Sequence, residues 1–306
     1  CRRGFDHFHG FLGDMMDDYY THLRHNQNYM RKNLENIDPR GHATDLFSDW
    51  AVEFIQSQYH TSQPFFLYLA YNAPHTPIQP PADWIERVRQ REPEASEERV
   101  RYSALVEHMD SGIGRVLDIL EKTDQLSNTL VIYTSDNGGQ LNVGATNGIL
   151  RGAKGQMYEG GIRVPACAMW SSQIDPGKVT TQVAMLMDLF PTICQVADVE
   201  IGHHIEGKSI FPTLRGERQD LSERNLYWVR KEGGQAFLGL NQHSVRQGNI
   251  KLLHNSPFEP LELYDLSADP QESHNIVHTE PDLFRQMSDI LQSEIQHSGT
   301  AVWQAK

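Results

Sequence analysis

Short apolar runs of strand length alternate with longer amphipathic stretches through the first half of the chain. Residues 64–71 and 129–134 are near-continuous apolar or β-branched runs, which favour buried strands. Apolar side chains recur at helical spacing over 46–55, after Thr44 as the predicted N-cap, and again over 96–122. Because helices alternate with strands in this order, the pattern predicts an α/β fold with helices packed around a mostly parallel sheet.

The pattern changes in the last third of the chain. After a strand predicted at 165–170 and a helix at 188–197, short segments bounded by Gly, Asn and Pro predict an antiparallel meander. These segments are 227–230, 236–240, 244–253 and 261–265. A closing helix is predicted at about 281–296. We therefore predict an α/β domain over 1–220 and a small carboxyl-terminal antiparallel sheet plus helix over 221–306.

Composition narrows the class of protein. The chain has 306 residues, of which 39% are hydrophobic, so it can build a sizeable core. Its formal net charge of −13 argues against nucleic acid as a partner, because phosphate backbones attract clustered Lys and Arg. No run approaches the roughly 20 apolar residues of a membrane span. The three cysteines cannot all pair with one another, and they lack metal-ligand spacing.

Candidate chemistry follows the run at 129–134. Asp136 and Asn137 come directly after it, between Ser135 and two glycines. A carboxylate and an amide oxygen side by side suit a hard cation such as Ca²⁺ or Mg²⁺, and Lys154 offers a positive charge for an anionic group nearby. The segment Asp-Asn-Gly-Gly at 136–139 is also typical of an ordinary turn, because Asp and Asn bond their own backbone and Gly accepts positive φ.

A histidine follows the other apolar run. His75 lies in the segment Ala-Pro-His-Thr-Pro at 73–77, where the two prolines restrict the backbone and disfavour helix. A histidine held in this way can be aimed at a ligand. A histidine in a proline-rich loop can equally be a plain surface residue, and its place after a core strand favours the functional interpretation.

Taken together, these segments resemble the sulfatase family of the alkaline-phosphatase-like superfamily. The family's motifs Ala-Pro-His-x-Pro, Ser-Asp-Asn-Gly, Leu-Arg-Gly-x-Lys and Tyr-Glu-Gly-Gly-x-Arg-x-Pro match, in order, residues 73–77, 135–138, 150–154 and 158–165. Two further pieces, 245–252 and 263–275, resemble the small carboxyl-terminal subdomain of sulfatases.

The resemblance implies hydrolysis of a sulfate ester, on a sulfated carbohydrate or an aryl sulfate, with a divalent metal. It assigns His75 and Lys154 to catalysis and sulfate contact, and Asp136 and Asn137 to the metal, calcium with magnesium as the alternative. Glu159, like Arg151 and Arg163, is expected either to support the site or to form a buried ion pair.

One part of the family pattern is missing from these residues. Sulfatases attack with a formylglycine made from the first residue of a Cys/Ser-x-Pro/Ala-x-Arg motif, and no such motif occurs here. Residues 3–6 match the family segment that follows that region. We therefore expect a carboxyl-terminal portion of a sulfatase, inactive or impaired alone, with exposed apolar strand edges. A missing amino-terminal segment or a second chain would supply the nucleophile.

Two other functions remain open. The missing nucleophile permits a non-catalytic binder of sulfated glycans or a scaffold protein. A phosphatase or phosphonate hydrolase of the same superfamily is the second alternative, and the contexts of Lys154 and His75 weigh against it. The compartment is open, although the family suggests a periplasmic or secreted protein.

Overall fold

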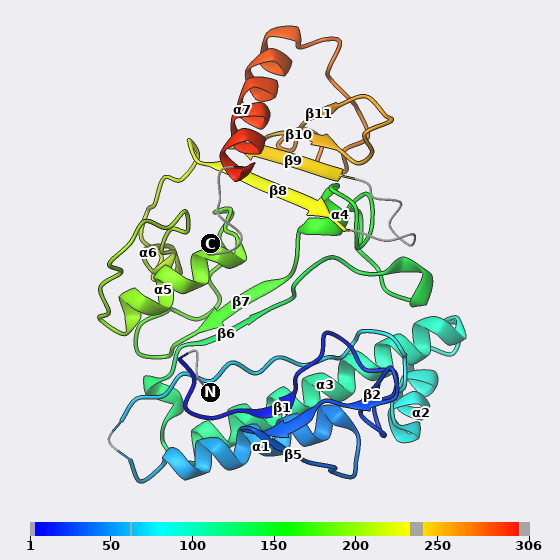
Figure 1. Cartoon of the computed structure of the whole chain (residues 1–306), viewed down its shortest axis with the longest axis vertical. Helices are drawn as coiled ribbons and strands as arrows, with labels where there is room; N and C mark the ends of the chain where they lie inside the picture. The colour runs from blue at the N-terminus through cyan, green and yellow to red at the C-terminus, as the bar shows by residue number, and fades with distance from the viewer. Residues whose placement is uncertain (1–3, 62, 233–240, 300–306) are drawn as a thin grey trace. The chain divides into compact units, whose positions relative to one another are not determined.

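The chain divides into two compact units (Figure 1). The computed structural model describes residues 4–61, 63–232 and 241–299. The first unit comprises residues 1–130 and 142–145, and the second comprises 131–141 and 146–306. The domain boundary expected near residue 220 remains a prediction.

Two long helices form the base of the first unit. They are α1 (Ala43–Gln58) and α3 (Glu97–Lys122), which confirms both predicted amphipathic stretches, and a shorter helix, α2 (Ala82–Arg91), packs beside α3. The predicted N-cap of α1 is wrong: His42 caps the helix, because its Nδ1 accepts the Thr44 N–H at 3.2 Å. That N–H is one of the donors that a helix leaves unsatisfied at its start.

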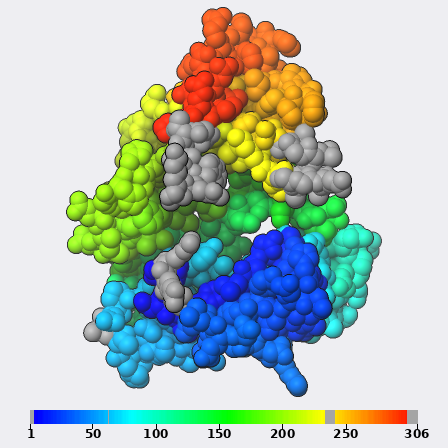
Figure 2. Space-filling view, viewed as in Figure 1, coloured from blue at the N-terminus to red at the C-terminus, as the bar shows by residue number. Residues whose placement is uncertain are grey.

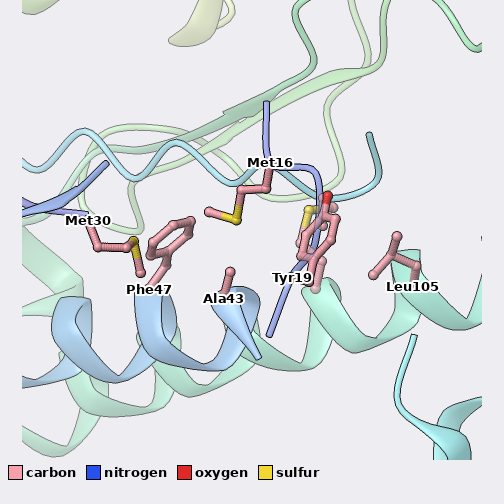
Figure 3. Packing of buried hydrophobic residues seen from close by; sticks show 8 residues of the cluster. Met16, Tyr19, Met30, Ala43, Phe47 and Leu105 are labelled. Carbon is pink, nitrogen blue, oxygen red and sulfur yellow. The ribbon is translucent and has the colours of Figure 1, made fainter. Parts of the chain in front are cut away.

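Small antiparallel ladders and a methionine-rich core complete the first unit. The strands are β1 (His9–Phe11), β2 (Leu23–Arg24), β3 (Gln27–Asn28), β4 (Met30–Lys32) and β5 (Glu35–Asn36), in the orders β1-β4-β5 and β2-β3. Figure 3 shows Phe47 and Ala43 of α1 pointing towards Met16, Met30 and the ring of Tyr19, all of them buried. Burying these side chains against one another supplies much of this unit's hydrophobic stabilisation.

The run at 64–71 does not pair as the strand that we predicted. It has no ladder partner among the described residues. Its side chains alternate in exposure: Phe66 and Tyr68 are 55% and 72% exposed, whereas Phe65 and Leu67 are half-buried. A strand is defined by hydrogen bonds to a neighbour, and the apolar pattern alone does not supply one. The prediction that this run is buried is therefore wrong for Phe66 and Tyr68.

The second unit begins with a two-stranded ribbon. Strand β6 (Val131–Thr134) pairs antiparallel with β7 (Ala166–Met169), so that Val131 faces Met169 and Thr134 faces Ala166. All ladders within the described ranges are antiparallel, so no pair among them forms the expected parallel sheet. The crossover that we predicted leads from the run at 64–71 through α3 to β6, but the run at 64–71 forms no ladder in the described ranges, and β6 pairs with β7 alone.

Short helices precede, separate and follow the two strands of this ribbon along the chain. They are η1 (Leu126–Asn128) at the end of the first unit, η2 (Leu141–Val143) and α4 (Glu159–Ile162) between the strands, and η3 (Leu186–Asp188), α5 (Leu189–Val196) and α6 (Phe211–Leu214) after β7. Helices η3 and α5 confirm the helix predicted at 188–197. The buried Asp188 accepts two hydrogen bonds from Arg224, at 2.9 and 2.7 Å.

An antiparallel sheet and a helix close the second unit, as predicted. The strands are β8 (Asn225–Lys231), β9 (Asn241–Gln247), β10 (Ile250–His254) and β11 (Glu262–Asp265), in the order β11-β10-β9-β8. Helix α7 (Pro281–Gly299) packs Met287 and Leu291 against Val245 and Leu252. In Figure 2 the red residues of α7 lie directly against the orange part of the chain that follows β9. The strand predicted at 236–240 lies outside the described residues.

None of the helices in the described part of the chain combines the length and the apolar character that a membrane crossing requires.

Candidate active site

Two loops of the second unit meet through their backbones. The first, residues 135–139, leaves the end of β6, and the second, residues 151–156, leads into α4. The Lys154 N–H donates to the Gly139 carbonyl at 3.1 Å, and the Asn147 side chain bonds both loops, accepting from Gly139 N at 2.8 Å and donating to Gly152 O at 2.9 Å. The structure thus brings the segment of Asp136 and Asn137 together with the segment of Lys154.

Helix α4 locks these loops in place by close backbone contact. The Gly138 N–H donates to the Gly161 carbonyl at 2.9 Å, and the Gly160 N–H donates to the Arg151 carbonyl at 2.7 Å. A Cβ atom on Gly138 would lie 1.8 Å from the Gly160 oxygen, and one on Gly160 would lie 2.5 Å from the Arg151 and Gly152 oxygens. Only glycine fits at these positions, because each meets a backbone atom that has no room to move.

The predicted metal and sulfate side chains are available to a ligand. Asp136 and Lys154 are exposed. Within the described ranges, the Lys154 ammonium has no hydrogen bond or ion pair, the Asn137 side chain has no hydrogen bond, and the Asp136 carboxylate has only a 3.5 Å contact from Ser135 Oγ. Free carboxylate and amide oxygens are the ligands that hard divalent cations prefer, so Asp136 and Asn137 fit such an ion.

His75 lies in the first unit, in a loop that the core holds. Its Nδ1 is 2.9 Å from the Thr76 carbonyl oxygen, which can only accept, so Nδ1 is the donor in this contact. The buried Tyr19 hydroxyl donates to the His75 carbonyl at 3.0 Å. The loop is therefore anchored on both sides of the imidazole, and Nε2 is the ring atom left for a ligand.

A buried hydrogen-bond network supports the chain just after this loop. The Gln79 carbonyl accepts from His42 Nε2 at 3.0 Å, and its side chain accepts the Tyr19 N–H at 2.8 Å. His42 Nδ1 already accepts from the start of α1, so the ring is neutral with its proton on Nε2. Burial lowers the pKa of His42 from 6.5 to about 4, in keeping with a ring that stays neutral.

One cluster in the first unit has the composition of a metal site. Ligand atoms of His42, Asp45 and His108 lie within 4.8 Å of one another. Both nitrogens of His42 are already engaged, and His108 Nε2 bonds Asp45 at 2.8 Å, an interaction that lowers the pKa of Asp45. Because His42 offers no free lone pair, this set does not fit a cation, and it acts as structural hydrogen bonding.

Two residues beside the site lie in segments that the sequence matched to the family but to which it assigned no role. Lys251 of β10 and Glu272 are fully buried, and both bond Glu159 of α4. Glu159 therefore belongs to a buried ion pair, one of the two alternatives that the sequence left open. Arg151 bonds the Glu272 carbonyl at 2.7 Å, whereas the Arg163 side chain is 63% exposed, 4.0 Å from Glu159. The adjacent Leu252 and Leu253 in β10 are the available signal, because they indicate a strand covered on both faces.

Comparison with known proteins defines the class. Two family models match, described as "Sulfatase" over residues 1–199 and "N-sulphoglucosamine sulphohydrolase, C-terminal" over residues 153–299. The first covers more than half of the chain, and its range includes the two loops described above. The chain belongs to the sulfatase family.

Particular relatives agree with this assignment. The chain is 29% identical to the uncharacterized sulfatase YdeN of Escherichia coli, over 97% of this chain and 57% of the relative. It is 33% identical to a sulfatase of Formosa agariphila, over 86% of this chain and 52% of the relative. The chain thus spans little more than half the length of these curated relatives.

A solved structure confirms the fold class. The crystal structure of Ps i-CgsB in complex with k-i-k-neocarrahexaose superposes with a TM-score of 0.86 at 28% identity, covering 95% of this chain and 66% of that chain. The α/β sulfatase fold with a carboxyl-terminal antiparallel sheet and helix is therefore confirmed, although the described residues contain no parallel ladder of their own.

Proposed function

We propose that this chain forms the sulfate-binding part of an enzyme that hydrolyses sulfate esters. The observation that carries the proposal is the pair of loops in the second unit, joined by the 3.1 Å bond from Lys154 N to Gly139 O. On this fixed backbone stand an exposed ammonium group and an exposed carboxylate, neither with an ion-pair partner in the described ranges. An ammonium beside free oxygens suits a sulfate group next to a divalent cation.

Each side chain has a distinct part in the proposal. Asp136 and Asn137 would hold calcium, with magnesium as the alternative, and the bound cation would supply Lewis-acid polarisation of the sulfate. Lys154 neutralises negative charge on the sulfate oxygens. For His75 we propose contact with the sulfate ester, with Nε2 as the atom that holds or donates the proton of the leaving oxygen.

The nucleophile needs a separate source. No Cys/Ser-x-Pro/Ala-x-Arg motif occurs in these 306 residues, so we propose that an amino-terminal segment or a second chain provides it. The purified 306-residue chain should then turn over sulfate esters slowly or not at all. A sulfated carbohydrate or an aryl sulfate is the proposed substrate class, and the neighbour solved with k-i-k-neocarrahexaose supports the carbohydrate.

The test is a calorimetric titration of the chain with inorganic sulfate in the presence of calcium, which measures the affinity for sulfate. Lys154→Ala should weaken sulfate binding about tenfold, which corresponds to roughly 1.4 kcal/mol. Lys208→Ala is the matched control, because Lys208 is also an exposed lysine of the second unit. Equal affinities for the wild type and Lys154→Ala would refute the proposed sulfate site. Turnover of an aryl sulfate by the pure chain, abolished by Lys154→Ala, would refute the expected inactivity.

A non-catalytic binder of sulfated glycans is the second candidate, and the missing nucleophile motif favours it. It predicts that a sulfated oligosaccharide binds the chain and loses no sulfate even when a polypeptide bearing the Cys-x-Pro-x-Arg motif is present. Release of sulfate in that mixture would reject the binder.

A further inference from the structure

Glu272 joins three parts of the second unit although it lies outside the two loops. Its Oε1 accepts from Lys251 Nζ at 2.8 Å, and its Oε2 accepts the Glu159 N–H at 2.6 Å. Its backbone carbonyl accepts from Arg151 at 2.7 Å. The side chain is completely buried, and burial raises its pKa while Lys251 opposes the shift. One residue of the carboxyl-terminal subdomain thus holds both ends of the segment 151–159.

Lys251 completes the cluster from the sheet. The side chain is fully buried in β10, and its ammonium bonds Glu159 at 2.9 Å as well as Glu272. Arg246 of the neighbouring strand β9 lies opposite Lys251 and reaches within 3.7 Å of Glu159. Two cations therefore balance two carboxylates. Such a cluster adds little net stability over an apolar core of the same shape, but it fixes the positions of its members closely.

The same face of the sheet holds Arg151 by other contacts. Its guanidinium lies 4.0 Å from the centre of the Tyr158 ring and donates to the Tyr264 hydroxyl at 3.0 Å. Glu262 accepts from the Tyr158 hydroxyl at 2.7 Å, and burial together with this bond raises the pKa of Tyr158 to about 12. From β8, Arg230 donates to the Gly155 carbonyl at 2.8 Å. Both flanks of Lys154 are therefore tied to the carboxyl-terminal sheet.

Helix α4 connects this buried cluster to the loop at 135–139, which carries Asp136 and Asn137. Glu159 opens α4, whose glycines bond the Arg151 carbonyl on one side and Gly138 on the other. These contacts join backbone to backbone with no room for a Cβ, so no flexible side chain can absorb a displacement of Glu159. A shift at Glu159 therefore moves both the loop of Lys154 and the loop of Asp136.

We propose that Lys251 and Glu272 are positioning residues of the sulfate site. They touch neither sulfate nor metal, and they set where the Lys154 ammonium and the Asp136 and Asn137 oxygens stand. This inference rests on the proposed function, and it makes the carboxyl-terminal sheet a part of the anion-binding machinery.

The test compares two variants of the chain with a matched control. Lys251→Met removes the ammonium, and Glu272→Gln keeps the shape of the side chain but replaces an acceptor with a donor. Arg224→Met is the control, because it leaves the buried carboxylate of Asp188, in the same unit, without its charge partner, and the bonds of that carboxylate go to Met185, Lys208 and Arg224 and not to either loop. All are measured at a temperature at which circular dichroism shows them folded.

Two measurements are made on each variant. The first is the affinity for inorganic sulfate with calcium, and the second is hydrogen exchange of the Lys154 amide, whose bond to Gly139 reports the junction of the loops without any ligand. Lys251→Met should weaken sulfate binding at least tenfold, Glu272→Gln at least threefold, and both should speed Lys154 exchange at least tenfold. Arg224→Met should lower thermal stability, yet leave both quantities within twofold of wild type.

The outcomes separate the two proposals. Wild-type exchange and sulfate affinity in folded Lys251→Met and Glu272→Gln would overturn the positioning role, as would an equal loss in Arg224→Met. If Lys251→Met fails to fold, Glu272→Gln alone decides in the same way. If the wild-type chain binds no sulfate, the proposed function fails, and the exchange of the Lys154 amide decides whether Lys251 and Glu272 hold the loops.

Discussion

Acid should loosen the start of α1 through one histidine. The pKa of His42 is lowered by burial from 6.5 to about 4, so the folded chain keeps the ring neutral where the unfolded chain protonates it. The stabilisation is complete above pH 6.5 and is lost as the pH falls towards 4. Between pH 6.5 and pH 5 the unfolded chain binds a proton at His42 that the folded chain does not bind. Over these roughly 1.5 pH units the free energy of unfolding falls by about 2 kcal/mol. Because His42 is only 3% exposed, solvent screening reduces this value little.

The assay is hydrogen exchange along α1 at pH 8 and pH 5, corrected for the intrinsic pH dependence of exchange. His42→Asn is the comparison, because an asparagine oxygen can still cap the Thr44 N–H but cannot titrate. The opening free energy of α1 should fall by about 2 kcal/mol more in the wild type than in the variant. Equal falls in the two proteins would refute the argument. Protonation takes place at Nδ1 and leaves the Nε2–H bond to the Gln79 carbonyl in place, so the loss should concern the start of α1.

Three further predictions concern a backbone contact, a helix cap and a buried ion pair. Gly138→Ala places a Cβ 1.8 Å from a backbone oxygen of α4 and should lower the free energy of unfolding, measured by urea denaturation, by about 3 kcal/mol or more. Gly202→Ala is the control: a Cβ there has nothing within 4 Å, so the same measurement should change by less than about 0.5 kcal/mol. Ser96→Ala removes the cap of α3 and should lower the opening free energy of that helix's amides, measured by hydrogen exchange, by about 1 kcal/mol. Unchanged exchange rates would contradict a stabilising role for the Ser96 cap. Asp188→Asn should lower the unfolding free energy by about 3 kcal/mol, since Arg224 is left without its charge partner, and an unaltered melting temperature would disprove this.

Local patterns predicted the helices and the carboxyl-terminal sheet well. Helix α3 begins and ends where its apolar stripe and the Ser96 cap indicate, because both signals lie within the element itself. Strand pairing is different, since it depends on a partner elsewhere in the chain. The runs at 64–71 and 129–134 have similar compositions, yet the first has no ladder partner in the described ranges and the second pairs antiparallel with β7. The composition of the two runs therefore does not predict which of them pairs, or with which partner.

The candidate site was likewise predictable only in part from local sequence patterns. The order of the motifs placed Asp136 and Lys154 on loops that the structure joins, while the joining of His75 to them stays a prediction because it lies in the other unit. No motif indicated the roles of Lys251 and Glu272. A lysine between Ile250 and Leu252 in a strand is usually taken to face solvent.

The sequence of β10 nevertheless contains the evidence that Lys251 is buried. Leu252 packs against α7, so its neighbours along the strand point to the opposite face, where Leu253 contacts Met157 and Tyr158. Two consecutive apolar residues in a strand indicate that both faces are covered, and Lys251 shares the covered face with Leu253. A lysine there must meet carboxylates, because an unpaired buried ammonium is too costly to keep. The carboxylates that it meets come from α4 and from the loop after β11, the two segments that also bond Arg151. The need to neutralise one buried charge therefore ties the carboxyl-terminal sheet to the loops that carry Asp136 and Lys154.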